Sequence, residues 1–409
     1  NGIGLAMRWP VFSAIVPELV PRTHLPSALG LNGIAMNASR IIGPLLAGVL
    51  IAGAGSVWVF ALNAVLSVIS GFVVVRWRRE HTPSPLGRER LVSAMRVGVQ
   101  FVWQSQRMRA VLLRVAIFFL HSTALLALLP LLARGLKGGD AGTFTLLLAA
   151  MGSGAIVAVL LLPRLRQAMG RDALVLRGAI LQAAATAVMS VAPNAWVAVP
   201  AMFMGGMAWI TSANSLSVSA QLSLPNWVRA RGMATYQMAI MGASAFGAAL
   251  WGQVATVSSL RTSLLAASVS GVLLMLLALR YVNDPQDEDD VSPAHEGWAA
   301  SPPSIKPGEE GRVLVTIEYH IDPARADAFK QVMEETRRVR LSQGAIEWAL
   351  LHHVGEPSRY VEQILDESWT EHLRRFGRAT AADITLRERR LAFHVGEGGP
   401  QVNRYIVQR

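Results

Sequence analysis

The sequence predicts two parts in one chain: an all-α bundle that spans a membrane, followed by a small α+β domain in water. Apolar runs long enough to cross a bilayer recur from the first residue to about residue 282. The loops between these runs differ in charge, and this assigns each loop to one side of the membrane. After residue 310 the apolar residues alternate as in strands or recur at helical spacing, which is typical of a folded domain outside the membrane.

Nine apolar stretches are candidates for membrane helices. At a rise of about 1.5 Å per residue, roughly 20 residues cross the hydrocarbon layer. The first stretch is partial because the sequence opens within it, and this predicts a fragment that lacks upstream helices. The nine predicted spans cover residues 1–16, 28–52, 56–76, 110–133, 142–163, 174–192, 195–218, 233–257 and 262–280.

The net charge of +11 is unevenly distributed along the chain. Residues 1–282 contain 22 Lys and Arg but five acids, all five of which are predicted to lie in loops. Most of these bases fall in alternate loops, above all in residues 76–109, so the positive-inside rule places those loops and the C-terminus in the cytoplasm. The positive charge therefore indicates topology and contact with a lipid bilayer, and not nucleic-acid binding. The chain has no cysteine, which excludes disulfides and thiolate metal sites.

Small residues mark the second span, which follows a turn rich in proline. Their spacing allows a neighbouring helix to pack backbone to backbone. A similar segment recurs 204 residues later, where Pro225 matches Pro21 and Gly247 matches Gly43. This repeat predicts two like halves, as in transporters built from parallel repeats. The small-residue motif comprises Gly30, Ser39, Gly43, Pro44, Ala47 and Gly48.

This motif resembles the antiporter motif in the fifth helix of drug and proton antiporters of the major facilitator superfamily, although Ser39 and Ala47 stand where that motif has glycine. Segments such as LLPLLARGLKGG and GSGAIVAVLLLPRLRQ resemble the branch that contains the enterobactin exporter and macrolide efflux proteins, the transmembrane secretion effectors. The resemblance covers nearly the whole chain. It implies the major facilitator fold with helices four to twelve present. It also implies proton-coupled export of siderophore-like or macrolide-like small molecules across the bacterial inner membrane by alternating access.

Polar side chains within the predicted spans are the candidates for substrate contact. Arg8 and Arg40 lie at membrane depth, where a guanidinium normally faces a partner or a watered cavity. Asn37 shares a helix face with Arg40. The partner of the arginines is either a carboxylate on the absent helices or an anionic ligand. For the polar residues of later spans, hydrogen bonding between helices is the alternative role. The later candidates are His121, Gln182 and Asn214.

The segment RLRQAMGRD at residues 164–172 resembles a degenerate form of the cytoplasmic motif between helices eight and nine of the superfamily. In that motif, arginines cap helix ends and hold the inward gate. The resemblance makes Arg164, Arg166 and Asp172 gating candidates in a loop. Ordinary positive-inside charge is the alternative explanation.

The predicted domains follow from these features. Residues 1–76 end the first membrane half, residues 77–109 form a cytoplasmic loop between the halves, and residues 110–282 form the second half. Residues 283–310 are acidic and rich in proline, which indicates a flexible linker. Residues 311–409 form a cytoplasmic domain.

In this last domain the elements follow the order βαββαβ, which resembles the ferredoxin-like monooxygenases of antibiotic biosynthesis that pair into dimeric barrels. Helix starts are marked at Asp322 and by two predicted capping boxes, Ser368 to Glu371 and Thr380 to Asp383. The resemblance implies a homodimer through this domain and polar strand faces that line a barrel lumen. Those faces carry Thr316, Glu318 and His320 on one strand, and Trp348, Leu350 and His352 on another.

The sequence offers no motif for catalysis. It contains no nucleophile triad, metal-ligand spacing or cofactor motif. We therefore predict a transporter and not an enzyme, with a small-molecule substrate, no cofactor and no metal. The alternative is a membrane-anchored enzyme or sensor in which the C-terminal domain is the active part.

Overall fold

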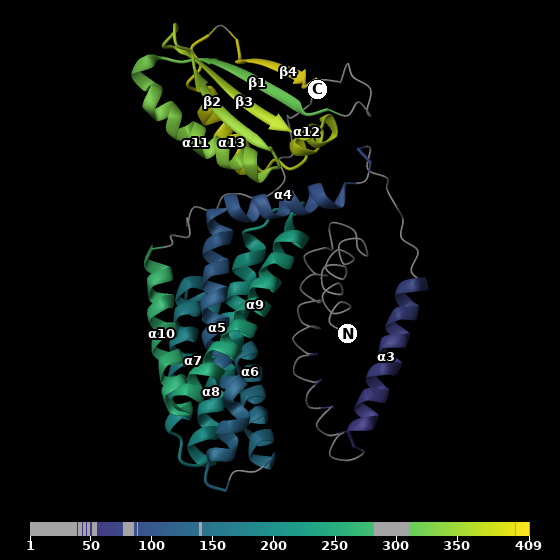
Figure 1. Cartoon of the computed structure of the whole chain (residues 1–409), viewed down its shortest axis with the longest axis vertical. Coiled ribbons are helices and arrows are strands. Elements are labelled where there is room, and N and C mark those ends of the chain that lie inside the picture. The colour runs from purple at the N-terminus through teal and green to yellow at the C-terminus, as the bar shows by residue number, and fades with distance from the viewer. Residues whose placement is uncertain are drawn as a thin grey trace.

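The computed structural model contains a helical bundle and, at one end of it, a domain with a β-sheet (Figure 1). It describes residues 39, 43, 46, 50, 55–76, 86, 87, 89–138, 141–281, 311–396 and 398–408. The predicted span at 1–16 lies outside these ranges. In the predicted span at 28–52, the four described residues are helical.

Seven helices of the described part are long and apolar enough to cross a membrane. Each coincides with one predicted span, and the largest difference is at the end of α6, which is predicted at residue 163 and observed at Ala168. The chain is thus mostly helical, as predicted. The seven helices are α3 (Ser56–Arg76), α5 (Gln106–Gly135), α6 (Ala141–Ala168), α7 (Arg171–Val191), α8 (Ala195–Leu222), α9 (Arg229–Val257) and α10 (Leu260–Tyr281).

Several helices extend beyond their apolar run because polar residues begin or end them. The hydroxyl of Ser105 caps α5 by accepting a hydrogen bond from the Met108 N–H at 3.2 Å. Asn194 caps α8 in the same way. One prediction is wrong here: Asp172 lies in the first turn of α7 and not in a loop. A carboxylate at that position is stabilised by the positive end of the helix dipole.

Glycines allow the membrane helices to touch backbone to backbone. A Cβ atom at Gly154 of α6 would lie 1.9 Å from the carbonyl oxygen of Phe203 in α8, and one at Gly206 of α8 would lie 1.9 Å from that of Met151 in α6. A Cβ atom at Gly247 of α9 would lie 2.3 Å from the carbonyl oxygen of Leu120 in α5. Such contacts hold helices together where the surrounding lipid is as apolar as the side chains.

The stretch 77–109 contains a helix, α4 (Leu91–Gln104), where the sequence analysis predicted a loop. It lies across the end of the bundle, between the membrane helices and the C-terminal domain (Figure 1). Its Phe101 meets Trp227 edge-on, with ring centroids 5.6 Å apart. The side of α4 away from these contacts carries Met95, Val99 and Trp103, which are exposed. Residues four positions apart lie on one face of a helix. This spacing is the sequence signal that the prediction of an arginine-rich loop missed.

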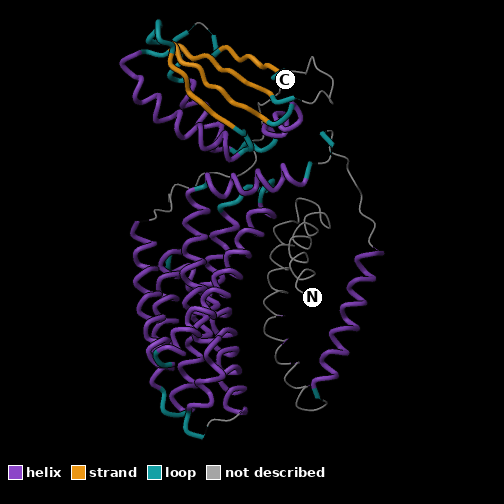
Figure 2. Tube along the Cα trace, viewed as in Figure 1, coloured by secondary structure: helices purple, strands orange, loops and turns teal. Residues whose placement is uncertain are grey.

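The C-terminal domain has one antiparallel four-stranded sheet in the order β2-β3-β1-β4, with its helices on one face (Figures 1 and 2). Each predicted strand is confirmed. The helices lie between the sheet and α4. In chain order the elements are β1 (Val313–His320), the 3-10 turn η2 (Pro323–Arg325), α11 (Ala326–Ser342), β2 (Glu347–His352), β3 (Arg359–Asp366), α12 (Trp369–Phe376), α13 (Ala381–Leu391) and β4 (Gln401–Ile406).

The predicted helix starts are present, with one difference. Asp322 caps the turn η2, and α11 follows directly. The capping box at Thr380 and Asp383 is complete. At Ser368 only half of the box forms: the hydroxyl accepts from the Glu371 N–H at 3.2 Å, but the Glu371 carboxylate pairs with arginines instead of the backbone.

The two predicted polar strand faces point to opposite sides of the sheet. In β1, Thr316 pairs in register with Gln363, on the face away from the helices. Trp348 of β2 lies on the helix-covered face, where its indole N–H donates to Glu362 at 3.1 Å. The prediction that both faces line one lumen is therefore wrong for a single domain, because neighbouring strands in this register place these residues on different faces.

Candidate functional site

Two of the predicted candidates, His121 of α5 and Gln182 of α7, lie in the wall of one small cavity, which α10 closes on its third side. The cavity, about 20 Å³, has room for one water molecule. Both side chains are buried, and Gly271 lets α10 approach closely, since a Cβ atom there would lie 3.0 Å from that of His121. The polar residues of the wall are His121, Ser122, Gln182, Thr186 and Ser268.

The cavity lies about halfway along the helices that form it. His121 is residue 16 of the 30 in α5, Gln182 is residue 12 of the 21 in α7, and Gly271 is residue 12 of the 22 in α10. Helices of these lengths span the hydrocarbon layer. The polar wall therefore lies near the bilayer midplane, which is where substrate and ion sites of transporters occur.

Two polar atoms of this wall have no partner within the described part of the chain: Ser122 Oγ and Gln182 Oε1. The other polar groups bond within their own helices: His121 Nδ1 lies 2.6 Å from the Ile117 carbonyl oxygen, and Thr186 donates to the carbonyl of Gln182 at 2.8 Å. An unpaired polar group at membrane depth is costly and marks a place for water or a polar ligand. The cavity thus offers a hydroxyl and an amide oxygen to such a guest.

The His121 ring is held in position by α9. Trp251 lies beside it, with ring centroids 5.6 Å apart. The indole N–H of Trp251 donates to the carbonyl oxygen of Leu120 at 3.0 Å. The backbone carbonyl oxygen of Trp251 accepts from the Ser263 hydroxyl at 2.7 Å. The first bond holds the indole against α5, and the second joins the backbone of α9 to α10. The Trp251 ring of α9 therefore borders the imidazole on one side.

The third candidate in this half, Asn214 of α8, is not part of the cavity. Its side-chain oxygen accepts a hydrogen bond from Arg166 at the end of α6. The structure thus joins a predicted substrate residue to a predicted gating residue. Because Arg166 lies near the end of α6, this contact ties α6 to α8 toward the end of the bundle where α4 lies.

The predicted gating residues lie on helix ends and not in a loop. Arg164 and Arg166 belong to the last turns of α6, and Asp172 to the first turn of α7. Asp172 accepts a hydrogen bond at 3.0 Å from Arg114 of α5, whose side chain is only 3% exposed. Sequence reasoning missed Arg114, although an arginine four residues into a predicted apolar span is a visible signal.

The pair of Arg114 and Asp172 predicts a measurable loss of stability. Asp172→Asn removes the charge from this ion pair and is expected to lower the free energy of unfolding by about 1–3 kcal/mol, as for a hydrogen bond to a charged group. Thermal unfolding in detergent measures this, with Arg164→Gln as the control at an exposed arginine on the neighbouring helix. An Asp172→Asn protein that unfolds at the parental temperature would contradict the role of the pair.

Several predicted residues lie outside the described residues. Of the small-residue motif, Ser39 and Gly43 are described, and both are helical. Among the described residues, no three His, Asp or Glu side chains group as a metal site. The predicted residues outside the described ranges are Arg8, Asn37, Arg40, Gly30, Pro44, Ala47 and Gly48.

Comparison with known families decides what kind of protein carries this cavity. The model of the transmembrane secretion effector family matches residues 1–409. The chain belongs to this family. As a transmembrane secretion effector of the major facilitator superfamily, it is a multi-pass membrane protein and a secondary transporter. The family match includes the C-terminal domain.

A solved structure, a variant of the fucose:proton symporter of E. coli, also matches this transmembrane secretion effector. It has 12% sequence identity and a TM-score of 0.44, over 66% of this chain and 71% of that chain. No curated protein matches the chain.

Proposed function

We propose that this transporter exports small organic molecules of siderophore-like or macrolide-like chemistry across the bacterial inner membrane, by alternating access and with proton coupling. The observation that carries the proposal is the midplane cavity with two atoms, Ser122 Oγ and Gln182 Oε1, that have no hydrogen-bond partner among the described residues. His121 is the titratable side chain in its wall. The two helix bundles would open this region to alternate sides of the membrane.

The charge of the helix ends supports a cytoplasmic C-terminal domain. At the end where α4 lies, nine arginines stand in the first or last turns of the membrane helices: Arg76, Arg107, Arg109, Arg164, Arg166, Arg171, Arg229, Arg231 and Arg280. The opposite end carries Arg134, Lys137 and Arg261. Because cytoplasmic ends carry the excess of basic residues, α4 and the C-terminal domain lie inside the cell in this proposal.

The C-terminal domain accompanies transport in this proposal and is not an enzyme. Its strand order β2-β3-β1-β4 supports a ferredoxin-like assignment, with residues 283–310 as the linker and 311–409 as the domain. The homodimer remains a prediction. The sheet face that would form it, opposite the helices, carries Leu314, Val361 and Leu365.

Substitution of the cavity amide tests the transport site. Gln182→Leu keeps the size of the side chain but removes the polar oxygen, so export is expected to fall about tenfold or more, the effect of one lost hydrogen bond. The control is Gln253→Leu, at an exposed position of α9. The rate is measured as uptake of an added labelled macrolide or labelled catecholate siderophore into inverted membrane vesicles whose lumen has been made acidic.

The outcomes of this assay separate the parts of the proposal. Normal export by Gln182→Leu, with unchanged thermal unfolding, would remove the cavity from the transport site. Transport of neither compound by the parent protein would contradict the substrate class. Export that persists after the pH gradient is collapsed would contradict proton coupling.

A further inference from the structure

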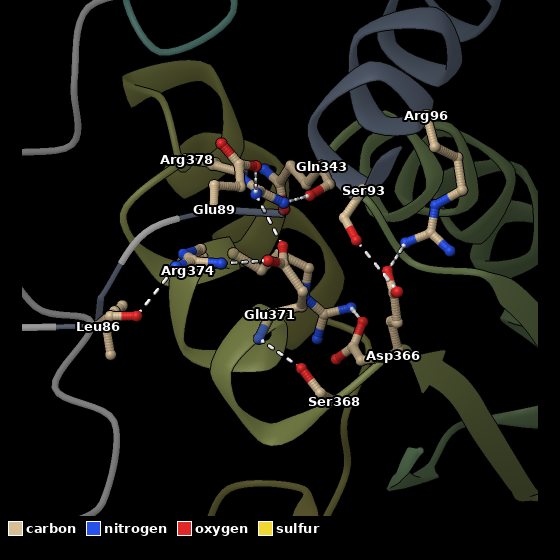
Figure 3. A network of polar contacts seen from close by, with 12 residues as sticks. Leu86, Glu89, Ser93, Arg96, Gln343, Asp366, Ser368, Glu371, Arg374 and Arg378 are labelled. Carbon is tan, nitrogen blue, oxygen red and sulfur yellow. Dashed lines mark hydrogen bonds and ion pairs between the residues drawn. The ribbon is translucent and has the colours of Figure 1, made fainter. Parts of the chain in front are cut away.

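The C-terminal domain is bound to the segment that precedes α4 by two arginines (Figure 3). Arg374 of α12 donates to the carbonyl oxygens of Leu86 and Gly87, at 2.9 and 3.1 Å. Arg378, in the turn after α12, donates to the carboxylate of Glu89 at 2.9 Å. These bonds fix the backbone and the side chain of the segment that leads into the second membrane half.

Helix α4 is bound at a second place. Arg96 donates to the carboxylate of Glu367 at 2.7 Å, and the Ser93 hydroxyl donates to the other oxygen of that carboxylate at 3.1 Å (Figure 3). One turn further on, the Gln100 amide donates to the Ala345 carbonyl oxygen at 3.4 Å. The domain thus holds α4 along two consecutive turns.

Glu89 also links the domain to the membrane bundle. Its carboxylate accepts from Arg378 of the domain and from Arg231, which lies in the first turn of α9. The Arg378 guanidinium lies over the ring of Trp227, 5.3 Å from the ring centroid, just before α9 begins. One side chain of the domain therefore contacts both the segment between the halves and the cytoplasmic end of a membrane helix.

These ion pairs are shielded from water. The side chains of Arg378 and Glu371, which pair at 2.9 Å, are each 7% exposed, and that of Glu89 is 23% exposed. Removing one member of a buried pair is strongly destabilising, because the remaining charge stays buried. The docked position is therefore a defined state of the chain and not a loose surface association.

We propose that the C-terminal domain is a clamp on the connection between the two membrane halves, and that its docked position restrains their separation on the cytoplasmic side. The first half ends at Arg76 in α3, and α5 of the second half begins at Gln106. With the domain docked, residues 86–104 are fixed to the second half. The ten peptide links from Arg76 to Leu86 then connect the halves and reach at most about 35 Å. With the domain released, the nearest anchor on the second half is Phe101, which packs against Trp227 without the domain, and the twenty-five links from Arg76 to Phe101 reach about 85 Å.

Distances between the halves test the clamp without a transported substrate. The chain has no cysteine, so Val75→Cys on α3 and Tyr281→Cys on α10 place two nitroxide labels at exposed ends of the two halves. In the reconstituted full chain, the double variant Arg378→Gln with Glu89→Gln is expected to lengthen the mean label distance by about 5 Å or more, the scale of a one-turn displacement. The control Glu334→Gln, which removes an exposed pair on α11, leaves the distance unchanged.

A crosslink reports whether the domain is docked. Cysteines at Ser93 and Glu367, joined by a short bifunctional thiol reagent, hold the domain on α4, since the two native side chains are in hydrogen-bond contact. In the double variant the crosslink yield is expected to fall. This experiment uses a chain that keeps Val75 and Tyr281, so the cysteines at 93 and 367 are its only thiols.

The combined results decide the proposal. A lower crosslink yield with an unchanged label distance would show that release of the domain leaves the halves in place, which would overturn the clamp. An unchanged yield would show that the ion pairs do not hold the domain, which would overturn it as well. The inference rests on the alternating access proposed above. Longer label distances in a protein that exports neither test compound would support the clamp while contradicting the substrate class.

Discussion

Replacement of Gly206 by valine is expected to prevent assembly of the second membrane half. A Cβ atom at this position would lie 1.9 Å from the carbonyl oxygen of Met151, and backbone atoms cannot move aside as a flexible side chain can. The helices α6 and α8 would have to separate, at a cost of about 3 kcal/mol or more for overpacking. The expected result is at least a tenfold loss of monodisperse protein in gel filtration after extraction, and the same loss for Gly154→Val.

A matched control lies on the same helix as one of these glycines. Gly152 of α6 is exposed, and no atom lies within 4 Å of a Cβ atom built on it. Gly152→Val is therefore expected to give the parental yield. If Gly206→Val and Gly152→Val behaved alike, the backbone contact between α6 and α8 would be refuted.

Glu362→Gln is expected to unfold or severely loosen the C-terminal domain. The Glu362 carboxylate is fully buried and accepts hydrogen bonds from Arg340 at 3.0 Å, Tyr319 at 3.0 Å and Trp348 at 3.1 Å. Neutralising it leaves the buried Arg340 guanidinium without this carboxylate, which typically costs about 3–5 kcal/mol. Hydrogen exchange of peptides from residues 311–408 in the full chain measures the loss. Parental exchange in Glu362→Gln would contradict the role of this carboxylate.

The same carboxylate predicts how the domain responds to acid. Burial alone would raise the pKa of Glu362, but the charges of Arg340 and Arg390 outweigh it and lower the pKa from 4.5 to about 2. A depressed pKa contributes stability above the unfolded value, and this stability is lost as the pH falls from about 4.5 toward 2. The loss amounts to about 3 kcal/mol. Pulse labelling at one fixed pH, after equilibration across this range, separates the effect from the intrinsic exchange rate.

The membrane helices were predictable because their signal is local. A run of about 20 apolar residues forms few structures other than a membrane helix. The seven described membrane helices match predicted spans. Their ends were less predictable, since helices continue through polar turns such as residues 106–109 and 164–168. Helix α4 was missed because the many arginines of residues 76–109 were interpreted as loop charge, although Met95, Val99 and Trp103 recur at helical spacing.

The grouping of the site residues was beyond local sequence reasoning. His121 and Gln182 were each visible as polar residues in an apolar span, but nothing in their spacing shows that α5 and α7 place them in one cavity. Asn214 looked equivalent and instead contacts Arg166. The contacts of Glu89 with Arg378 and Arg231 join three distant segments, so they depend on tertiary packing that no short pattern encodes.

The contact between Glu89 and Arg378 also sets an order of events during synthesis. The two residues are 289 positions apart, and ribosomes add about 5–20 residues per second. Arg378 is therefore added to the chain about 15–60 s after Glu89, and the six helices of the second half enter the bilayer in this interval. A nascent chain that ends before α12 lacks Arg374 and Arg378, so it keeps the longer connection between the two halves. The docked domain thus distinguishes chains synthesised through Arg378 from products that end before this residue.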